Sequence, residues 1–303
     1  MTEGASRSAR RRPSPAKLYG LIAVMVSLWS ANYVVAKVAL RDFEPLLLSG
    51  LRTTLASLSL LPVYFWNRRR RPPDARLRRD LPLLAALGVV GVALNQVLFV
   101  NGLSRTSVGH SALVIGMTPI LVLLLAAFAG LERIGARKFL GMGIALGGIA
   151  LLNLAPGRSA GASLPGDAFV FAASVTFSWF TVYGKLVTAR HGAVVVSTAV
   201  YAGAALALAP VTIWHALGGS LARVTLAGWL SVFFMALFPS MVCYLIFAYA
   251  LEHIPASRVS MFSYAQPVLA TLIAIPVLGE TVGGGLAAGG ALVLAGVWIT
   301  ERA

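Results

Sequence analysis

The chain is poor in cysteine and in acidic residues. Its single cysteine, Cys243, cannot form a disulfide within the chain, so cysteine usage says nothing about the redox compartment. Only 10 of the 303 residues are Asp or Glu, against 25 Lys or Arg, and the charged fraction is 12%. No Walker loop, HExxH sequence or cluster of Cys and His with metal-ligand spacing is present. These absences argue against ATP-driven pumping, a bound metal and a cofactor.

Apolar residues are abundant instead. They make up 58% of the chain, and the mean hydropathy of +0.83 indicates a bilayer environment, since a soluble fold does not need so many apolar side chains. A hydrocarbon core about 30 Å thick demands runs of about 18 to 25 mostly uncharged residues. We expect ten such helices, at 18–40, 46–66, 81–103, 107–130, 138–155, 166–188, 193–215, 225–250, 256–278 and 282–300.

Basic residues gather in alternate loops. Placing the N-terminus in the cytoplasm collects the arginines of residues 7–12, 68–71 and 76–79 on one side and leaves few on the other. This bias predicts a multi-pass protein of the cell inner membrane with both termini in the cytoplasm. Nucleic-acid binding is the disfavoured alternative, because a basic segment next to a span also holds anionic membrane lipids. The basic start before Leu18 resembles a signal peptide, but the apolar run is too long, which favours a retained first span.

The chain repeats itself at an offset of 148 residues. The matched pairs are Pro119 and Pro267, Glu132 and Glu280, Gly141 and Gly289, and Gly148 and Gly296. If each half holds five spans, the odd number makes the second half enter the membrane from the opposite side. We therefore expect an all-α integral membrane protein of ten transmembrane helices, arranged as two inverted five-helix repeats. Its segments are a cytoplasmic basic tail at 1–17, a first repeat at 18–155, a connecting loop at 156–165, a second repeat at 166–300 and a cytoplasmic C-terminus at 301–303.

Inverted repeats are a recurrent plan for secondary transporters, in which the substrate site lies near the midplane between the repeats. The alternative is that duplication was only the way in which a large bundle evolved. Two glycine pairs, Gly143 with Gly147 and Gly285 with Gly289, have the spacing of close helix contacts. We expect the fifth and tenth spans to form a scaffold through these faces.

Several residues in both halves have the pattern of a known family. They are Trp29 with Lys37 in the first span, Pro45 with Arg52 in the second, and the doubled pattern of Pro, Glu, Gly and Gly. On these residues the chain resembles the EamA-type carriers of the drug/metabolite transporter superfamily, and most of all the amino-acid exporters of the YddG aromatic type. The resemblance implies export of metabolites or drugs and a central cavity built from spans 3, 4, 8 and 9, with help from spans 1 and 6. Lys185 departs from the pattern, because it stands closer to Trp179 than Lys37 does to Trp29.

All ten carboxylates lie in a tail, in a loop or at the end of a span. A charge at the midplane is expensive, so carriers that couple to protons or bind cations usually retain one there for function. We therefore expect neutral or zwitterionic substrates and allow for facilitated, downhill movement. Histidine can carry protons near neutral pH. However, the four histidines stand near the ends of spans, where an interfacial role is the alternative.

The candidate substrate-binding residues share a position inside a span together with a polar or aromatic side chain, or a proline that kinks the helix. They are Tyr33, Asn95, Phe99, Asn101, Met117, Pro119, Trp179, Tyr183, Tyr244, Ser260, Tyr264, Gln266 and Pro267. The prolines free backbone carbonyl groups, which a cavity with water or ligand would satisfy. Bending for packing, interhelical hydrogen bonds and interfacial aromatic belts are the alternatives.

Three charged residues are candidates for gating. Glu132 and Glu280 stand just beyond spans 4 and 9, where the alternative role is to end one helix or cap the next. Lys37 is the third, and both it and Arg52 have the alternative of extending toward the membrane surface. A further possibility for Lys37 is attraction of a substrate carboxylate.

The sequence thus predicts a secondary transporter that exports small metabolites, above all neutral or aromatic amino acids, from a cavity between the repeats. Its partners would be that small-molecule substrate and membrane lipids, with the protein as a monomer or homodimer. Export of drugs, nucleosides or other metabolites by the same architecture is the alternative. An intramembrane lipid-modifying enzyme is disfavoured because no acid, base and nucleophile converge at one depth, and a receptor is disfavoured because the loops are short.

Overall fold

A computed structural model describes residues 14–70, 76–130, 135–154, 163–218, 220–280 and 283–301. These residues are helical, with no strand among them. The first half contains α1 (Pro15–Ala39), α2 (Pro45–Arg70), α3 (Leu77–Ala86), η1 (Leu87–Leu94), α4 (Asn95–Arg105), α5 (Val108–Ile115), α6 (Thr118–Phe128) and α7 (Ala136–Leu154). The second half contains α8 (Leu164–His191), α9 (Ala193–Leu217), η2 (Ser220–Arg223), α10 (Leu226–Met235), η3 (Ala236–Val242), α11 (Cys243–His253), α12 (Ala256–Ser260), η4 (Met261–Tyr264), α13 (Ala265–Leu278) and α14 (Gly284–Glu301).

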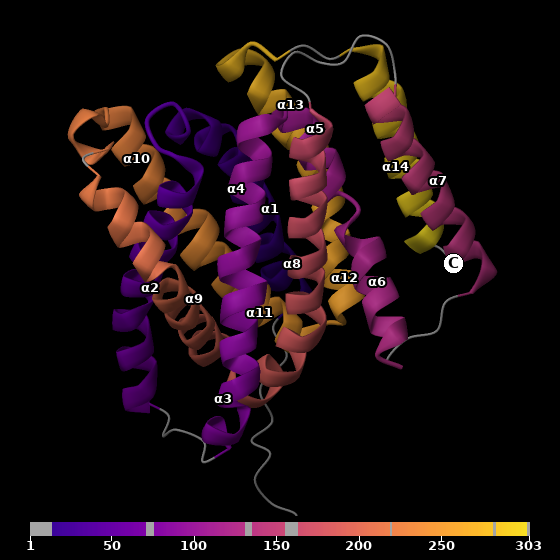
Figure 1. Ribbon diagram of the computed structural model, residues 1–303. Coiled ribbons are helices and arrows are strands. Elements are labelled where there is room, and N and C mark those ends of the chain that lie inside the picture. The colour runs from indigo at the N-terminus through magenta and orange to yellow at the C-terminus, as the bar shows by residue number, and fades with distance from the viewer. Residues whose placement is uncertain are drawn as a thin grey trace, which may run out of the picture.

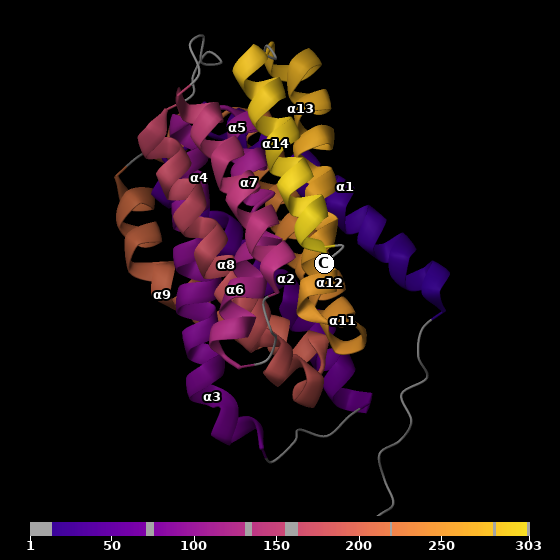
Figure 2. The same cartoon turned by 90° about the vertical axis from the view of Figure 1, so that its right-hand side faces the viewer.

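The predicted membrane bundle is confirmed. Among the described residues, eight helical runs are long and apolar enough to cross a bilayer. Helices α7 and α14 occupy the fifth and tenth predicted spans. The helices lie roughly side by side along the long axis (Figures 1 and 2). We call the end with the turns at 40–44, 105–107 and 279–280 the upper end, as in Figure 1, and the opposite end the lower end.

The third and eighth spans each contain a π-helical segment at the same place. The two segments, η1 and η3, are separated by the repeat offset, and both adjoin the central cavity, since Asn95 directly follows η1 and Pro239 lies within η3. Gly91 permits the close approach of η1 to α8, because a Cβ atom there would lie 2.8 Å from Cβ of Phe180. A π-helical turn widens the helix locally and often marks a functional site. Its presence in both halves makes it a property of the repeat.

Both mid-span prolines stand directly after a break in their helix. Gly116 and Met117 separate α5 from α6, which begins at Thr118, next to Pro119. The 3-10 helix η4 precedes α13, in which Pro267 is the third residue. The breaks meet, since a Cβ atom on Gly116 would lie 3.3 Å from Cγ of Pro267. The kinks expected at these prolines are therefore present, and they bring spans 4 and 9 together at mid-depth.

Helices α7 and α14 pack on each other at one side of the bundle (Figures 1 and 2). The expected contact is wrong for Gly143 and Gly147, because nothing lies within 4 Å of a Cβ atom on either residue. Gly289 does lie at the contact, since a Cβ atom on Gly148 would lie 2.8 Å from its carbonyl oxygen, and Gly296 packs closely on Ala145 of α7. A Cβ atom on Gly148 would lie 2.7 Å from the backbone nitrogen of Val293. One helical turn has room for several glycines, and only the packing decides which of them faces the partner.

Two buried hydrophobic clusters lie along the bundle axis. The lower one includes Ile22, Leu60 and Phe247, and the upper one includes Phe43, Leu103 and Val108. Many large apolar side chains face outward, where a bilayer would cover them. The central cavity lies between the two clusters.

Candidate functional site

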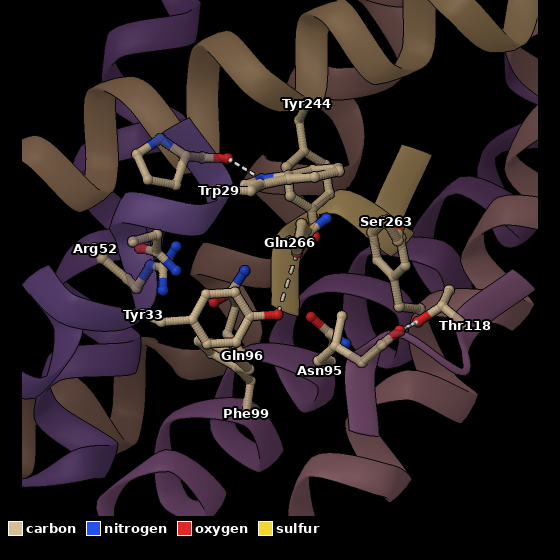
Figure 3. Close-up of a pocket in the computed structure, with 14 residues that line it drawn as sticks. Trp29, Tyr33, Arg52, Asn95, Gln96, Phe99, Thr118, Tyr244, Ser263 and Gln266 are labelled. Atoms are coloured by element: carbon tan, nitrogen blue, oxygen red, sulfur yellow. Dashed lines mark hydrogen bonds between the residues drawn. The ribbon is translucent and has the colours of Figure 1, made fainter. Parts of the chain in front are cut away.

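The cavity lies between the two halves, with a lining drawn from α1, α2, α4, α8, η3, α11 and the helix breaks of spans 4 and 9, and has a volume of about 80 Å³ (Figure 3). About 10–15 Å³ by this measure holds one water molecule, so the cavity has room for several water molecules or part of a small solute. The lining residues are Trp29, Asn32, Tyr33, Arg52, Asn95, Gln96, Phe99, Ile115, Thr118, Phe177, Pro239, Tyr244, Ser263 and Gln266.

Aromatic rings form one wall of the cavity. The indole Nε1 of Trp29 donates a hydrogen bond to the carbonyl oxygen of Pro239 at 3.1 Å, which holds α1 against η3. The Trp29 ring meets Phe177 edge to face at a centroid distance of 5.8 Å, and Tyr244 at 6.1 Å. Pro239 lies in a π-helical segment, where it removes a backbone donor. Aromatic edges at these distances attract one another and hold a rigid apolar surface toward the cavity.

Two hydrogen bonds tie polar lining residues to the opposite half. The Tyr33 hydroxyl donates to Oε1 of Gln266 at 3.2 Å, joining α1 to α13 (Figure 3). The Asn95 amide nitrogen donates to the carbonyl oxygen of Ala173 at 2.7 Å, joining α4 to α8. Both bonds cross the interface between the repeats, so they help to fix the width of the cavity.

Arg52 is buried in the lining, with 2% of its surface exposed. Its Nε and Nη2 donate to the hydroxyl of Ser240 at 3.3 and 3.0 Å, while Nη1 has no hydrogen-bond partner. The expectation that Arg52 extends to the membrane surface is therefore wrong, because the guanidinium turns inward toward η3. No Asp or Glu is among the described residues that line the cavity. A buried charge is stable only when it is paired and hydrogen-bonded, so this cation lacks its main source of stabilisation.

Two amide oxygens in the lining also lack partners. Asn32 Oδ1 and Gln96 Oε1 are buried and accept no hydrogen bond. Within the described residues, five buried side-chain polar atoms are without a hydrogen-bond partner. Three belong to the lining residues Asn32, Arg52 and Gln96, and the other two are the hydroxyl oxygens of Ser111 and Tyr201. Most buried polar atoms in folded proteins are hydrogen-bonded. Three such atoms belong to residues that line one cavity, where a bound solute or water would supply the missing partners.

Five of the predicted binding residues line the cavity, namely Tyr33, Asn95, Phe99, Tyr244 and Gln266. Others are close but face elsewhere. Met117 packs with Ile120 and Met142 in a third apolar cluster, and Tyr264 adjoins it. Pro119 and Pro267 adjoin the helix breaks without lining the cavity.

The remaining predicted residues lie away from the cavity. Asn101 bonds the carbonyl oxygen of Val97 near the upper end of α4. Ser260 donates to the carbonyl oxygen of Ser257 within α12. Trp179 and Tyr183 pair with each other on α8 at a centroid distance of 5.4 Å.

The sequence-based prediction left out nine lining residues. They are Trp29, Asn32, Arg52, Gln96, Ile115, Thr118, Phe177, Pro239 and Ser263. Arg52 carried a usable signal, because an ionisable residue within a transmembrane span is by default a candidate for function. Phe177 carried none, because it cannot be told by sequence from the phenylalanines that face lipid.

Two of the three gating candidates, Glu280 and Lys37, lie at the upper end. Oε1 and Oε2 of Glu280 accept hydrogen bonds from the backbone nitrogens of Val108 at 2.8 Å and Gly109 at 3.2 Å, so Glu280 caps α5 of the other half. Gly279, with φ of 69°, makes the turn that directs Glu280 there. Lys37 is half-buried and within electrostatic range of Glu280. Glu132 lies outside the described residues.

A second polar group joins the halves at the same end. Asp167, in the first turn of α8, accepts a hydrogen bond from the hydroxyl of Thr106 at 2.6 Å and lies 3.0 Å from Nδ1 of His110. His110 and Asp167 are 1% and 4% exposed. His110 is therefore buried between helices, which differs from the interfacial alternative for it. The pair lies near the end of its helices, away from the cavity lining.

Two homologous halves of membrane-spanning helices, with a polar and aromatic cavity between them, have the architecture of a secondary transporter. The EamA-like transporter family matches the chain twice, at residues 16–154 and 164–302. The chain belongs to this family and is a multi-pass membrane transporter.

Relatives of similar length support this assignment. An uncharacterized transporter of Archaeoglobus fulgidus is 28% identical over 94% of this chain and 99% of its own. The uncharacterized inner membrane transporter YedA of Escherichia coli is 26% identical over 87% of this chain and 84% of its own. A probable terminal-alkyne amino-acid exporter of Streptantibioticus cattleyicolor is 28% identical over 94% of this chain and 93% of its own. A crystal structure with 21% identity, covering 95% of this chain and 97% of its own, has a TM-score of 0.67, which shows the shared fold.

Proposed function

We propose that the protein exports small metabolites, above all neutral and aromatic amino acids, across the cell inner membrane. The observation that carries the proposal is the cavity at mid-depth between the repeats, with an aromatic wall and unpartnered polar atoms. A pocket of this composition suits a small molecule with one apolar and one polar part. The relative named as a probable amino-acid exporter supports the same substrate class.

Transport proceeds by alternating access in this proposal. The upper and lower clusters lie on either side of the cavity, and in this proposal each separates in turn for a solute to pass. We propose that the lower end and both termini face the cytoplasm, and the excess of Lys and Arg in the loops that the predicted topology assigns to that side supports this orientation. Glu280 and Lys37 act at the upper gate, which opens toward the outside. No described acidic residue lines the cavity, and we propose facilitative, downhill movement.

Flux into proteoliposomes tests the proposal directly. Purified protein should give saturable uptake and counterflow of labelled phenylalanine and leucine, and an ionophore that removes only the proton gradient should leave the rate unchanged. Trp29→Ala, which removes part of the aromatic wall, should lower the flux strongly. Trp214→Ala is the matched control, because Trp214 is 79% exposed on the outer face of α9.

The outcomes separate the parts of the proposal. Absence of saturable flux for every neutral amino acid, with correctly folded protein, would overturn the amino-acid assignment. Competition by nucleosides or drugs alone would favour the alternative cargo. Collapse of flux with the ionophore would show coupling to protons.

A further inference from the structure

Arg52 and the two amide oxygens carry an inference that rests on the proposed function and deepens it. We propose that the cavity recognises a zwitterion, with the carboxylate of the cargo on Nη1 of Arg52 and its ammonium group on Asn32 Oδ1 and Gln96 Oε1. Figure 3 shows Arg52 and Gln96 at the cavity, and Asn32 also belongs to its lining, so all three residues come from the first half of the chain.

The carboxylate position follows from the geometry of Arg52. Ser240 uses Nε and Nη2, which fixes the guanidinium plane, and leaves Nη1 unpartnered. Arginine presents its donors in a planar fork that matches a carboxylate, and it stays charged at physiological pH. Because no described lining residue is acidic, the anion that pairs with Arg52 has to come with the cargo.

The ammonium position follows from the amide oxygens. An ammonium group has three donors and no acceptor, so it needs oxygens that are not already used. Asn32 Oδ1 and Gln96 Oε1 are such oxygens. They are also neutral, which matters beside Arg52. A carboxylate at either position would pair with Arg52 itself and close the site to the cargo.

The combination disfavours cations, uncharged solutes and dicarboxylates. A cation would be repelled by Arg52 without a carboxylate to hold it, and a neutral solute would leave the buried guanidinium unpaired. A dicarboxylate would bring two charges to one cation. The aromatic wall of Trp29, Phe177 and Tyr244 remains for an apolar side chain.

The repeat shows that Arg52 is not required for helix packing. At the offset of 148 its counterpart is Val200, and the counterpart of Ser240 is Val92, both fully buried in the lower cluster. Helix α2 packs on η3 as α9 packs on η1, so the equivalent positions carry an arginine bonded to a serine in one half and two buried valines in the other. Arginine at this contact is therefore a property of the cavity and not of the fold.

Thermal shift and equilibrium binding in detergent test the proposal on the unaltered protein. The probes are phenylalanine, phenethylamine, which lacks the carboxylate, and 3-phenylpropionate, which lacks the ammonium group. We expect phenylalanine to bind about 10- to 100-fold more tightly than phenethylamine, the range for one hydrogen bond to a charged group. 3-Phenylpropionate should bind with intermediate strength. Equal binding of phenylalanine and phenethylamine would overturn the assignment of Arg52.

Variants then locate the contact. Arg52→Gln should abolish the preference for phenylalanine over phenethylamine, while Arg52→Lys should retain part of it. Asn32→Leu and Gln96→Leu should weaken phenylalanine binding more than 3-phenylpropionate binding. Arg41→Gln, at an exposed position in the upper turn, is the matched control.

The results distinguish this inference from the proposed function. If phenylalanine is transported equally by the unaltered protein and by folded Arg52→Gln, the inference fails and the amino-acid transporter stands. If the unaltered protein transports only solutes without a carboxylate, both fail. If Arg52→Gln does not fold, binding of the three probes to the unaltered protein still tests whether the cavity recognises a zwitterion.

Discussion

At equivalent positions of the two repeats, the first half carries Arg52 and Gln96 where the second half carries Val200 and Tyr244. The backbone features around them are shared, since a π-helical segment and a helix break recur at the same places in both halves. Duplication thus preserved the scaffold, while the side chains diverged. The first half supplies the charge and three of the four lining amides, namely Asn32, Asn95 and Gln96, while both halves supply aromatic rings to the cavity.

The largest expected loss of stability is at the close contact between α7 and α14, the fifth and tenth spans, which occupy equivalent places in the two halves. Gly148→Leu and Gly296→Leu should each lower the free energy of unfolding by about 3 kcal/mol or more, because a side chain there meets backbone atoms that cannot move aside. Unfolding in detergent by denaturant measures the loss. Gly143→Leu, with nothing within 4 Å, is the control and should change stability little. A loss at only one of the two glycines would show that α7 and α14 do not contribute equally.

The next largest loss of stability is expected at Lys185, and a smaller loss is expected at its counterpart Lys37. The ammonium of Lys185 donates to the carbonyl oxygens of Leu251 and Ile254 at 2.9 and 2.7 Å, at the lower end of α11. Lys185→Met should therefore lower the free energy of unfolding by about 1.5–3 kcal/mol, as expected for hydrogen bonds to a charged group. Lys37→Met should have a smaller effect, since its interaction with Glu280 is through space. Equal losses in the same unfolding assay would contradict this difference.

A smaller effect is expected at the upper end. Glu280→Ala removes the cap on Val108 and Gly109 and should lower the free energy of unfolding by about 0.5–2 kcal/mol, the usual range for a helix cap. Glu280→Gln, which retains an acceptor oxygen, should lose less. If Glu280 also acts as a gate, Glu280→Ala changes the flux into proteoliposomes by more than this loss of stability explains. An unchanged flux would leave the cap as its only role.

The smallest change in stability is expected for a pair of partly exposed side chains at the upper end, His215 and Glu44. His215 Nδ1 lies 2.7 Å from Glu44 Oε2, with 28% and 63% of the two side chains exposed. His215→Ala should change the free energy of unfolding by about 0–1 kcal/mol, since solvent screens such a pair. A larger loss would show that this upper-end contact helps to hold α2 and α9 together.

Much of the fold could be predicted from the sequence, but less of the cavity. Tyr33, Asn95 and Gln266 were found because a polar group inside a span must face protein or a cavity. Trp179 was placed by the same reasoning, yet Phe177, two residues earlier, lines the cavity instead. Successive residues on one helix point in different directions, so two side chains that are two residues apart face different surroundings. Here one of them lines the cavity and the other does not.

The sequence by itself determined the ten spans, the repeat and the helix breaks. These features depend on local requirements, namely the length that a bilayer imposes and the backbone donor that a proline lacks. The tertiary structure alone decided which side chains meet in the cavity. In a membrane both the lipid-facing and the buried face of a helix are largely apolar, so periodicity does not separate them. The inward direction of Arg52, set by its bond to Ser240 from the other half, is therefore visible only when the halves are assembled.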